Sequence, residues 1–94
     1  MTTPYLGLRE HGPEYIAYRI LKRAKENGRG VVMVFWSPND SIRIIQPSSF
    51  RAYVGSQYEL SEDHLIGTYN RDAQLEHIED DLIAAMQERS RRAA

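Results

Sequence analysis

The side chains best suited to metal binding are three histidines, and they are scattered along the chain. His11, His64 and His77 have no histidine partner at helical spacing. His77 precedes Asp80 and Asp81 by three and four residues, so two ligands can share one face of a helix. Two ligands do not complete a coordination shell, and nothing else in the sequence supplies the rest. The sequence therefore predicts neither a metal site nor a cofactor, and it favours a solvated acidic helix face here.

The patterns of nucleophilic and acid–base catalysis are also missing from the sequence. It contains no cysteine, and none of its serines lies in a G-x-S-x-G elbow. The carboxylates between Glu76 and Asp81 are expected on an exposed helix, whereas acid–base catalysis needs a carboxyl group held in a pocket. Gly28-Arg29-Gly30 leads into a strand, the reverse of the order found in nucleotide-binding loops. We therefore expect that the protein is not an enzyme, and a small enzyme without a visible motif is the third hypothesis.

Basic side chains gather in the first third of the chain, where they suit phosphate binding. Residues 1–30 carry six Lys or Arg residues against three acidic ones. Tyr15 and Tyr18 accompany them and offer rings on which bases can stack. A net charge of −1 is unlike that of a dedicated nucleic-acid-binding protein, so direct DNA or RNA binding is the second hypothesis. The residues that would carry it are Arg19, Lys22, Arg23, Lys25 and Arg29.

Aromatic residues point instead to recognition of another protein. Trp36 ends an apolar run and is followed closely by turn-forming residues, so it is expected either to project at a hairpin tip or to pack as a lid on the last helix. Trp and Tyr commonly anchor interfaces, and six tyrosines is a high number for this length. The candidate partner-binding residues at this hairpin tip are Trp36, Pro38, Asn39 and Asp40.

The other candidate for protein binding is an acidic surface. Residues 59–88 carry nine Asp or Glu residues against one Arg. A surface of this sign can dock on a basic partner or imitate phosphates. The candidate residues are Glu76, Glu79, Asp80 and Asp81. The first hypothesis is therefore a non-catalytic protein-binding module, an inhibitor or regulator that docks on a larger protein or nucleic-acid-processing complex through this surface and exposed aromatics.

Length and composition indicate one domain over residues 1–94. With 41% hydrophobic and 27% charged residues, the chain has globular composition but too few residues for two cores. The absence of cysteine suits a reducing compartment, and the longest apolar run has six residues, far below the roughly 20 that span a bilayer. No signal-peptide pattern is visible. We expect a soluble cytoplasmic protein, and its small core is compatible with a homodimer.

A hairpin over residues 31–46 is the expected centre of the fold. Val31 to Trp36 is β-branched and aromatic, which is typical of a strand covered on both faces. The return strand, 41–46, has one mixed face and is expected nearer the edge. That strand places Ile42 and Ile44 on one face and Arg43 and Ile45 on the other.

Helical patterns precede and follow the hairpin. Pro13 suits the first position of a helix over 13–27, which Gly28 ends. Apolar residues at helical spacing predict a last helix over 71–90 that Asn70 caps. A short helical turn over 48–54 and strands over 57–60 and 64–69 are expected between them, with residues 1–11 a flexible arm or short edge strand and 91–94 a frayed tail. The fold class is α+β: a helix, an antiparallel hairpin or meander of two to four strands, and a long C-terminal helix packed on the sheet.

Overall fold

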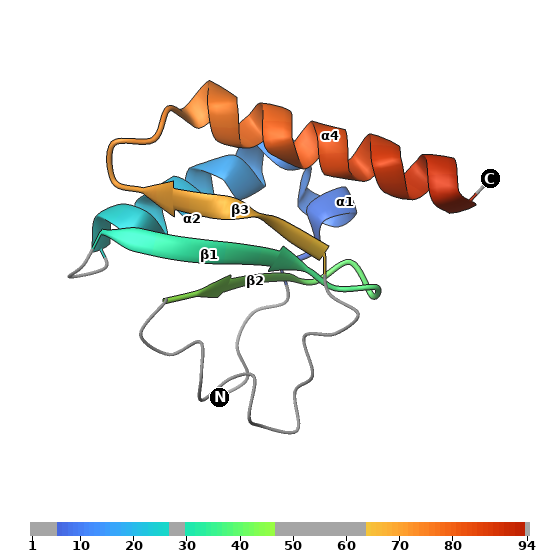
Figure 1. Cartoon of the computed structure of the whole chain (residues 1–94), viewed down its shortest axis with the longest axis horizontal. Coiled ribbons are helices and arrows are strands. Elements are labelled where there is room, and N and C mark those ends of the chain that lie inside the picture. Colours follow the sequence, from blue (N-terminus) through green and yellow to red (C-terminus); the bar gives the residue numbers. More distant parts are fainter. Residues whose placement is uncertain (1–5, 27–29, 47–63, 94) are drawn as a thin grey trace, which may run out of the picture.

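A computed structural model of the chain describes residues 6–26, 30–46 and 64–93. These residues form three helices and a three-stranded antiparallel sheet, with the C-terminal helix packed on the sheet (Figure 1). The α+β fold class predicted from the sequence is confirmed. In chain order the elements are α1 (Leu8–His11), α2 (Pro13–Glu26), β1 (Val31–Trp36), β2 (Ile42–Ile45), β3 (His64–Asn70) and α4 (Leu75–Ala93).

Strand β1 lies in the middle of the sheet, in the order β2-β1-β3. Its alternate residues Val32, Val34 and Trp36 are fully buried. Val34 pairs with Ile44 of β2 on one side and with Gly67 of β3 on the other. The apolar run is thus paired along both edges, as a central strand is. Strand β2 lies at one edge of the sheet, so the predicted edge position of the return strand is confirmed.

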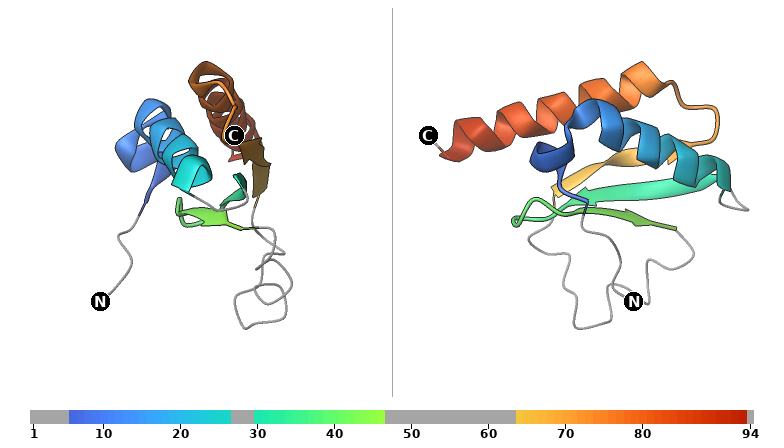
Figure 2. Two further views of the ribbon diagram at one scale, coloured as in Figure 1. Left: turned by 90° about the vertical axis from the view of Figure 1, so that its left-hand side faces the viewer. Right: turned by 180° about the vertical axis from the view of Figure 1, so that it is seen from behind.

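Helices α2 and α4 lie side by side in one layer over the same face of the sheet and run in opposite directions (Figure 2). The predicted stripe of α2 is buried, with Ile16, Ile20 and Ala24 fully covered. Ile78 and Leu82 of α4 face the same core. Burying one apolar stripe per helix against one sheet face is what holds these two layers together. Among the described residues, no helix is long and apolar enough to cross a bilayer.

The segment before α2 joins the hairpin and then turns into a short helix. Gly7 forms an antiparallel bridge with Ser41, and the carbonyl of Leu6 accepts the amide of Ile42 at 2.7 Å. Helix α1 follows and is separated from α2 by Gly12, whose φ of 89° favours glycine. Of the segment expected to be a flexible arm or a short edge strand, Leu6 and Gly7 thus pair at the sheet edge and Leu8–His11 are helical. Residues 1–5 lie outside the described part.

The start of α4 differs from the sequence prediction. Asn70 is not its cap but the last residue of β3, paired with Val31. The side-chain Oδ1 of Asn70 accepts the amide of Asp72 at 2.9 Å. The carbonyl of Gln74 accepts the amides of His77 and Ile78, so the helix begins at Leu75. An Asn side chain can accept a backbone amide two residues further on in a turn. Asn70 does so here and does not cap a helix, because its backbone belongs to the ladder between β1 and β3. The helix then continues to Ala93, beyond the predicted end at 90.

The element predicted over 64–69 is present as β3. Helix 13–27 is present as α2 and ends, within the described part, at Glu26. The short helical turn predicted over 48–54 and the strand predicted over 57–60 lie outside the described residues, as does the last residue of the tail.

Candidate functional site

Trp36 lies in the core, which decides between the two positions that the sequence left open. Its side chain is fully buried, and its indole Nε1 donates to Oδ1 of Asp40 at 3.0 Å. A ring in this position contributes packing and does not project toward a partner. Of the other residues predicted at the hairpin tip, Pro38 and Asn39 are exposed and Asp40 is half-buried.

Asp40 binds the hairpin turn to the first helix. Its φ of 76° lies in the left-handed region, which Asp tolerates better than most residues. Its two carboxylate oxygens accept the amide of Arg9 at 3.1 and 3.0 Å, and its carbonyl accepts the amide of Leu8 at 3.0 Å. These contacts satisfy amides at the start of α1. A structural role thus accounts for the chemistry of Asp40.

Arg89 of α4 covers the indole of Trp36. Its guanidinium carbon lies 3.3 Å from the ring centroid, and its nitrogens donate to the carbonyls of Ser37 at 2.8 Å and Trp36 at 3.1 Å. The flat face of the guanidinium stacks on the indole, and the N–H groups at the edge of the guanidinium donate the two hydrogen bonds. The contact joins the C-terminal half of α4 to the hairpin turn.

The predicted basic face lies on α2 beside two exposed tyrosines. Tyr15 and Tyr18 are 41% and 53% exposed, and Arg19 donates to the hydroxyl of Tyr15 at 3.2 Å. Tyr18 forms part of the wall of two hollows, of about 330 and 430 Å³. The first is lined by Tyr18, Leu21, Lys22, Lys25 and Glu26, and the second by His11, Glu14, Tyr15, Tyr18 and Leu75. Arg23 is also exposed on α2, whereas Arg29 lies outside the described residues.

The predicted acidic residues lie in the first half of α4. Glu76 and Asp80 are exposed, and Glu79 and Asp81 are half-buried. Because α4 lies beside α2, the acidic and basic helices share one layer of the molecule (Figure 2). The charge asymmetry of the sequence therefore does not divide the protein into two opposite faces.

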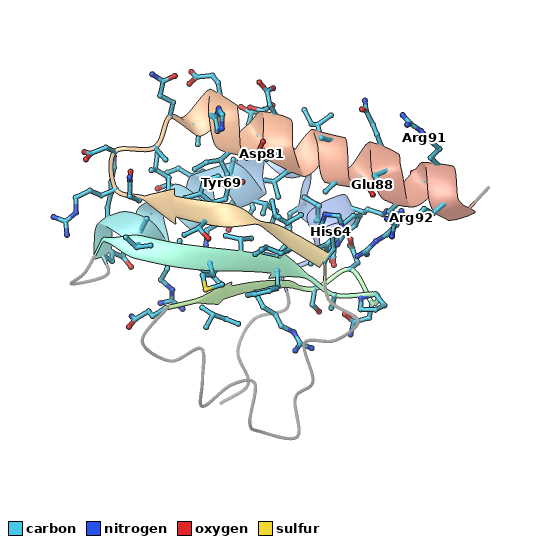
Figure 3. The ribbon with its side chains drawn as sticks, in the orientation of Figure 1. His64, Tyr69, Asp81, Glu88, Arg91 and Arg92 are labelled. Atoms are coloured by element: carbon cyan, nitrogen blue, oxygen red, sulfur yellow. The ribbon has the colours of Figure 1, made fainter. Side chains whose placement is uncertain are left out.

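Asp81 is the one of these carboxylates that contacts the sheet. The hydroxyl of Tyr69, which is buried, donates to its Oδ2 at 2.7 Å, and the two residues face each other across β3 and α4 (Figure 3). Burial raises the pKa of the Tyr69 phenol well above its ordinary value, and the neighbouring Asp81 carboxylate raises it further. The phenol thus keeps its proton and donates the hydrogen bond to Asp81. His77 Nε2 lies 3.9 Å from the same Oδ2.

These residues line an open pocket of about 440 Å³ formed by β3, the turn that follows it and the first half of α4. We call it the acidic pocket; it is lined by Gly67, Thr68, Tyr69, Asn70, Asp72, Ala73, His77 and Asp81. Within the described residues, neither the carboxylate of Asp72 nor Oδ1 of Asp81 accepts a hydrogen bond. Two carboxylates with oxygens available in one pocket can accept the donors of a cationic group.

The outer edge of β3 borders the acidic pocket. The amide of Arg71 donates to the carbonyl of Gly30 at 2.9 Å, so alternate residues of β3, including Tyr69, direct their backbone groups toward β1. Thr68 therefore directs its amide and carbonyl outward. Within the described ranges no backbone group pairs with them. Leu65, on the same strand, is 50% exposed.

Across residues 6–26, 30–46 and 64–93, no group of three or more metal-ligating side chains comes together. His77 and Asp81 are near each other as the helical spacing predicts. Sequence reasoning missed Tyr69, Asp72 and the outer edge of β3. The signals available in the sequence were the strand pattern of residues 64–70 and the short turn that leads from this strand to α4. Neither signal indicates which strand lies at the edge of the sheet. No protein-family model, curated protein or solved structure matches this chain.

Proposed function

We propose that the protein is a non-catalytic protein-binding module that docks on a larger protein through β3 and the acidic first half of α4. The observation that carries this proposal is the outer edge of β3, which pairs with no strand in the described part of the chain and lies beside the carboxylates of Asp72 and Asp81. An unpaired strand edge offers backbone donors and acceptors to another chain, and the carboxylates select a basic one. Its role is that of a cytoplasmic inhibitor or regulator that occupies the basic surface of a nucleic-acid-processing complex.

The arrangement of charges favours a protein partner over a nucleic acid. A polyanion that approached the basic residues of α2 would also meet Glu76 and Asp80 on the neighbouring α4. Repulsion between like charges weakens such binding. A folded protein can match both signs because its own surface charges vary over the same distance.

Affinity capture with matched variants tests the proposal. The protein is immobilised and exposed to native lysate of its source cells, in parallel with an Asp72→Asn/Asp81→Asn variant and a Glu88→Gln control. Asn keeps an acceptor for the Tyr69 hydroxyl and removes the charge. Glu88 is an acidic residue of the same helix that pairs with Arg92 at 2.9 Å, away from the acidic pocket.

We expect at least one protein that the wild type and Glu88→Gln capture and the double variant does not. Capture of nothing at any salt concentration contradicts the proposal. Equal capture by all three proteins contradicts it as well, because the pocket carboxylates would then contribute nothing.

The second candidate function is direct binding of DNA or RNA by α2. The observation in its favour is the position of Tyr18, an exposed ring that shares a hollow with Lys22 and Lys25. Gel-shift titration at low salt with single-stranded and duplex oligonucleotides tests it. Charge reversal at Lys22 and Arg23 should abolish any shift, and a shift that survives would exclude this face.

A further inference from the structure

We propose that the partner contributes an extended segment that adds to the sheet as a fourth strand beside β3, with a Lys or Arg side chain in the acidic pocket. This inference rests on the proposed protein-binding function and names the chemistry of the partner at that site. It makes a separate claim, because a protein can dock on these carboxylates without forming any strand.

The backbone of β3 supplies the first part of the argument. The strand has seven residues, and the outward amide and carbonyl of Thr68 lie near its centre. The amide of Asn70 points the same way, while its carbonyl already accepts the amide of Ala73 at 3.1 Å. An added strand about 4.8 Å away would satisfy the groups of Thr68.

The other edge of the sheet is less suited to an added strand. Strand β2 has four residues, and the amide of Ile42 already donates to the carbonyl of Leu6. The bridge between Gly7 and Ser41 continues this pairing. Among the described strands, β3 therefore offers the longer edge and the one that pairs with no further strand.

The pocket defines which side chain the added strand would carry toward the helices. Residues on that face of an added strand lie beside Gly67 and Tyr69, under α4. There they meet the carboxylate of Asp72 and the available Oδ1 of Asp81, whose side chain is 38% exposed. A guanidinium or ammonium group satisfies both carboxylates, whereas an acidic or apolar side chain leaves them unpaired.

The opposite face of β3 favours an apolar residue. Leu65 pairs with Phe35 across the ladder and lies 50% exposed on the face away from the helices. An apolar side chain of the added strand that lies beside Leu65 would remove this surface from water. The segment that fits β3 therefore alternates basic and apolar residues.

Synthetic peptides test the inference directly. The probe is a capped peptide as long as β3, seven residues, that alternates valine with arginine. The control replaces every arginine with glutamate. Two further versions carry N-methyl groups, one on every valine amide and the other on every arginine amide, so that each blocks the donors of one edge of the peptide.

We expect the arginine peptide to bind in a calorimetric or fluorescence titration and the glutamate peptide not to bind. One N-methylated version should lose binding and the other keep it, because only one edge of the peptide pairs with β3. Retained binding by both versions overturns the strand addition but leaves docking on the carboxylates, and hence the proposed function, in place. Absence of binding by the unmodified peptide also overturns this inference, while the lysate capture decides the proposed function separately.

Two protein variants examine the same contact from the other side. Thr68→Pro removes the outward amide of β3 without removing a bond to β1, and Thr68→Val keeps the amide. Loss of one backbone pair should weaken peptide binding by roughly tenfold in the proline variant only. Circular dichroism and thermal unfolding check that both variants fold, and the N-methyl series decides the question if the proline variant does not.

A second copy of the chain is the competing occupant of this edge. Sedimentation velocity across a range of protein concentrations, with and without the arginine peptide, distinguishes the two. A monomer that binds the peptide supports the inference. A dimer that Thr68→Pro dissociates and the peptide does not displace overturns it.

Discussion

The phenol of Tyr69 lies against the backbone of Gly67, two residues earlier on the same strand. A Cβ at Gly67 would lie 2.7 Å from the Tyr69 hydroxyl oxygen and 2.9 Å from the ring carbon that bears it. The glycine thus makes room for the ring, and the ring brings its hydroxyl to Asp81 at 2.7 Å. Strand β3 and helix α4 are joined at the acidic pocket by this arrangement.

Gly67→Ala should destabilise the protein by about 1–3 kcal/mol, because the new methyl group displaces the ring and breaks the bond to Asp81. Urea unfolding measures the loss. In a Tyr69→Phe background the same substitution should cost less, since the closest of the clashing atoms is gone. An equal cost in both backgrounds would show that Tyr69 is not what makes Gly67 necessary.

Stability should fall at alkaline pH because of Tyr69. Burial and Asp81 raise the folded-state pKa of its phenol, so folding favours the neutral form. The contribution of this phenol to stability is therefore complete at pH values below its ordinary pKa of about 10. This contribution is lost as pH rises above that value, toward the folded-state pKa. Urea midpoints at pH 8 and above pH 10 measure the effect. Tyr69→Phe should show a smaller drop, and an identical drop would contradict the assignment.

Replacement of Arg89 should loosen the contact between α4 and the hairpin. Arg89→Lys keeps the charge but loses the planar stacking and the paired donors to Trp36 and Ser37, at a cost of about 1–2 kcal/mol. Trp36 is the only tryptophan of the chain, so its fluorescence reports the change without a label. The matched control is Arg91→Lys, which alters an exposed residue of the same helix and should leave the spectrum unchanged.

Asp40 should tolerate asparagine better than alanine. Asp40→Ala removes the acceptor of the buried indole and of the Arg9 amide, and should cost about 2–3 kcal/mol. Asp40→Asn keeps an acceptor oxygen and suits the positive φ, so the expected cost is smaller. Thermal unfolding of the two variants ranks them. Equal destabilisation would mean that the charge, and not the acceptor geometry, is what the turn requires.

The fold was predictable where local pattern and burial agree. Val31 to Trp36 is apolar throughout and becomes the central strand, and the α2 stripe is buried as its spacing predicts. The start of α4 was not predictable in the same way. Asn70 suits both a helix cap and a turn, and the choice depends on the distant Val31, with which it pairs.

The candidate site depended even more on distant partners. Trp36 and Asp40 lie four residues apart, but Arg89 meets the carbonyl of Trp36 from 53 positions further along the chain. The acidic pocket likewise combines β3 with α4, and only the tertiary fold brings Tyr69 to Asp81. Composition indicated only that acidic residues are numerous in this part of the chain; that several of them lie beside an edge strand follows from the tertiary fold.

The pairing of Gly7 with Ser41 has a consequence for how many partners the sheet can take. Because it occupies part of the already short β2 edge, the sheet has a single long edge open to addition among the described strands. One incoming strand fills that edge, and two copies joined through it expose only their β2 sides. Association through the sheet should therefore end at a fixed one-to-one stoichiometry and not continue into a fibre.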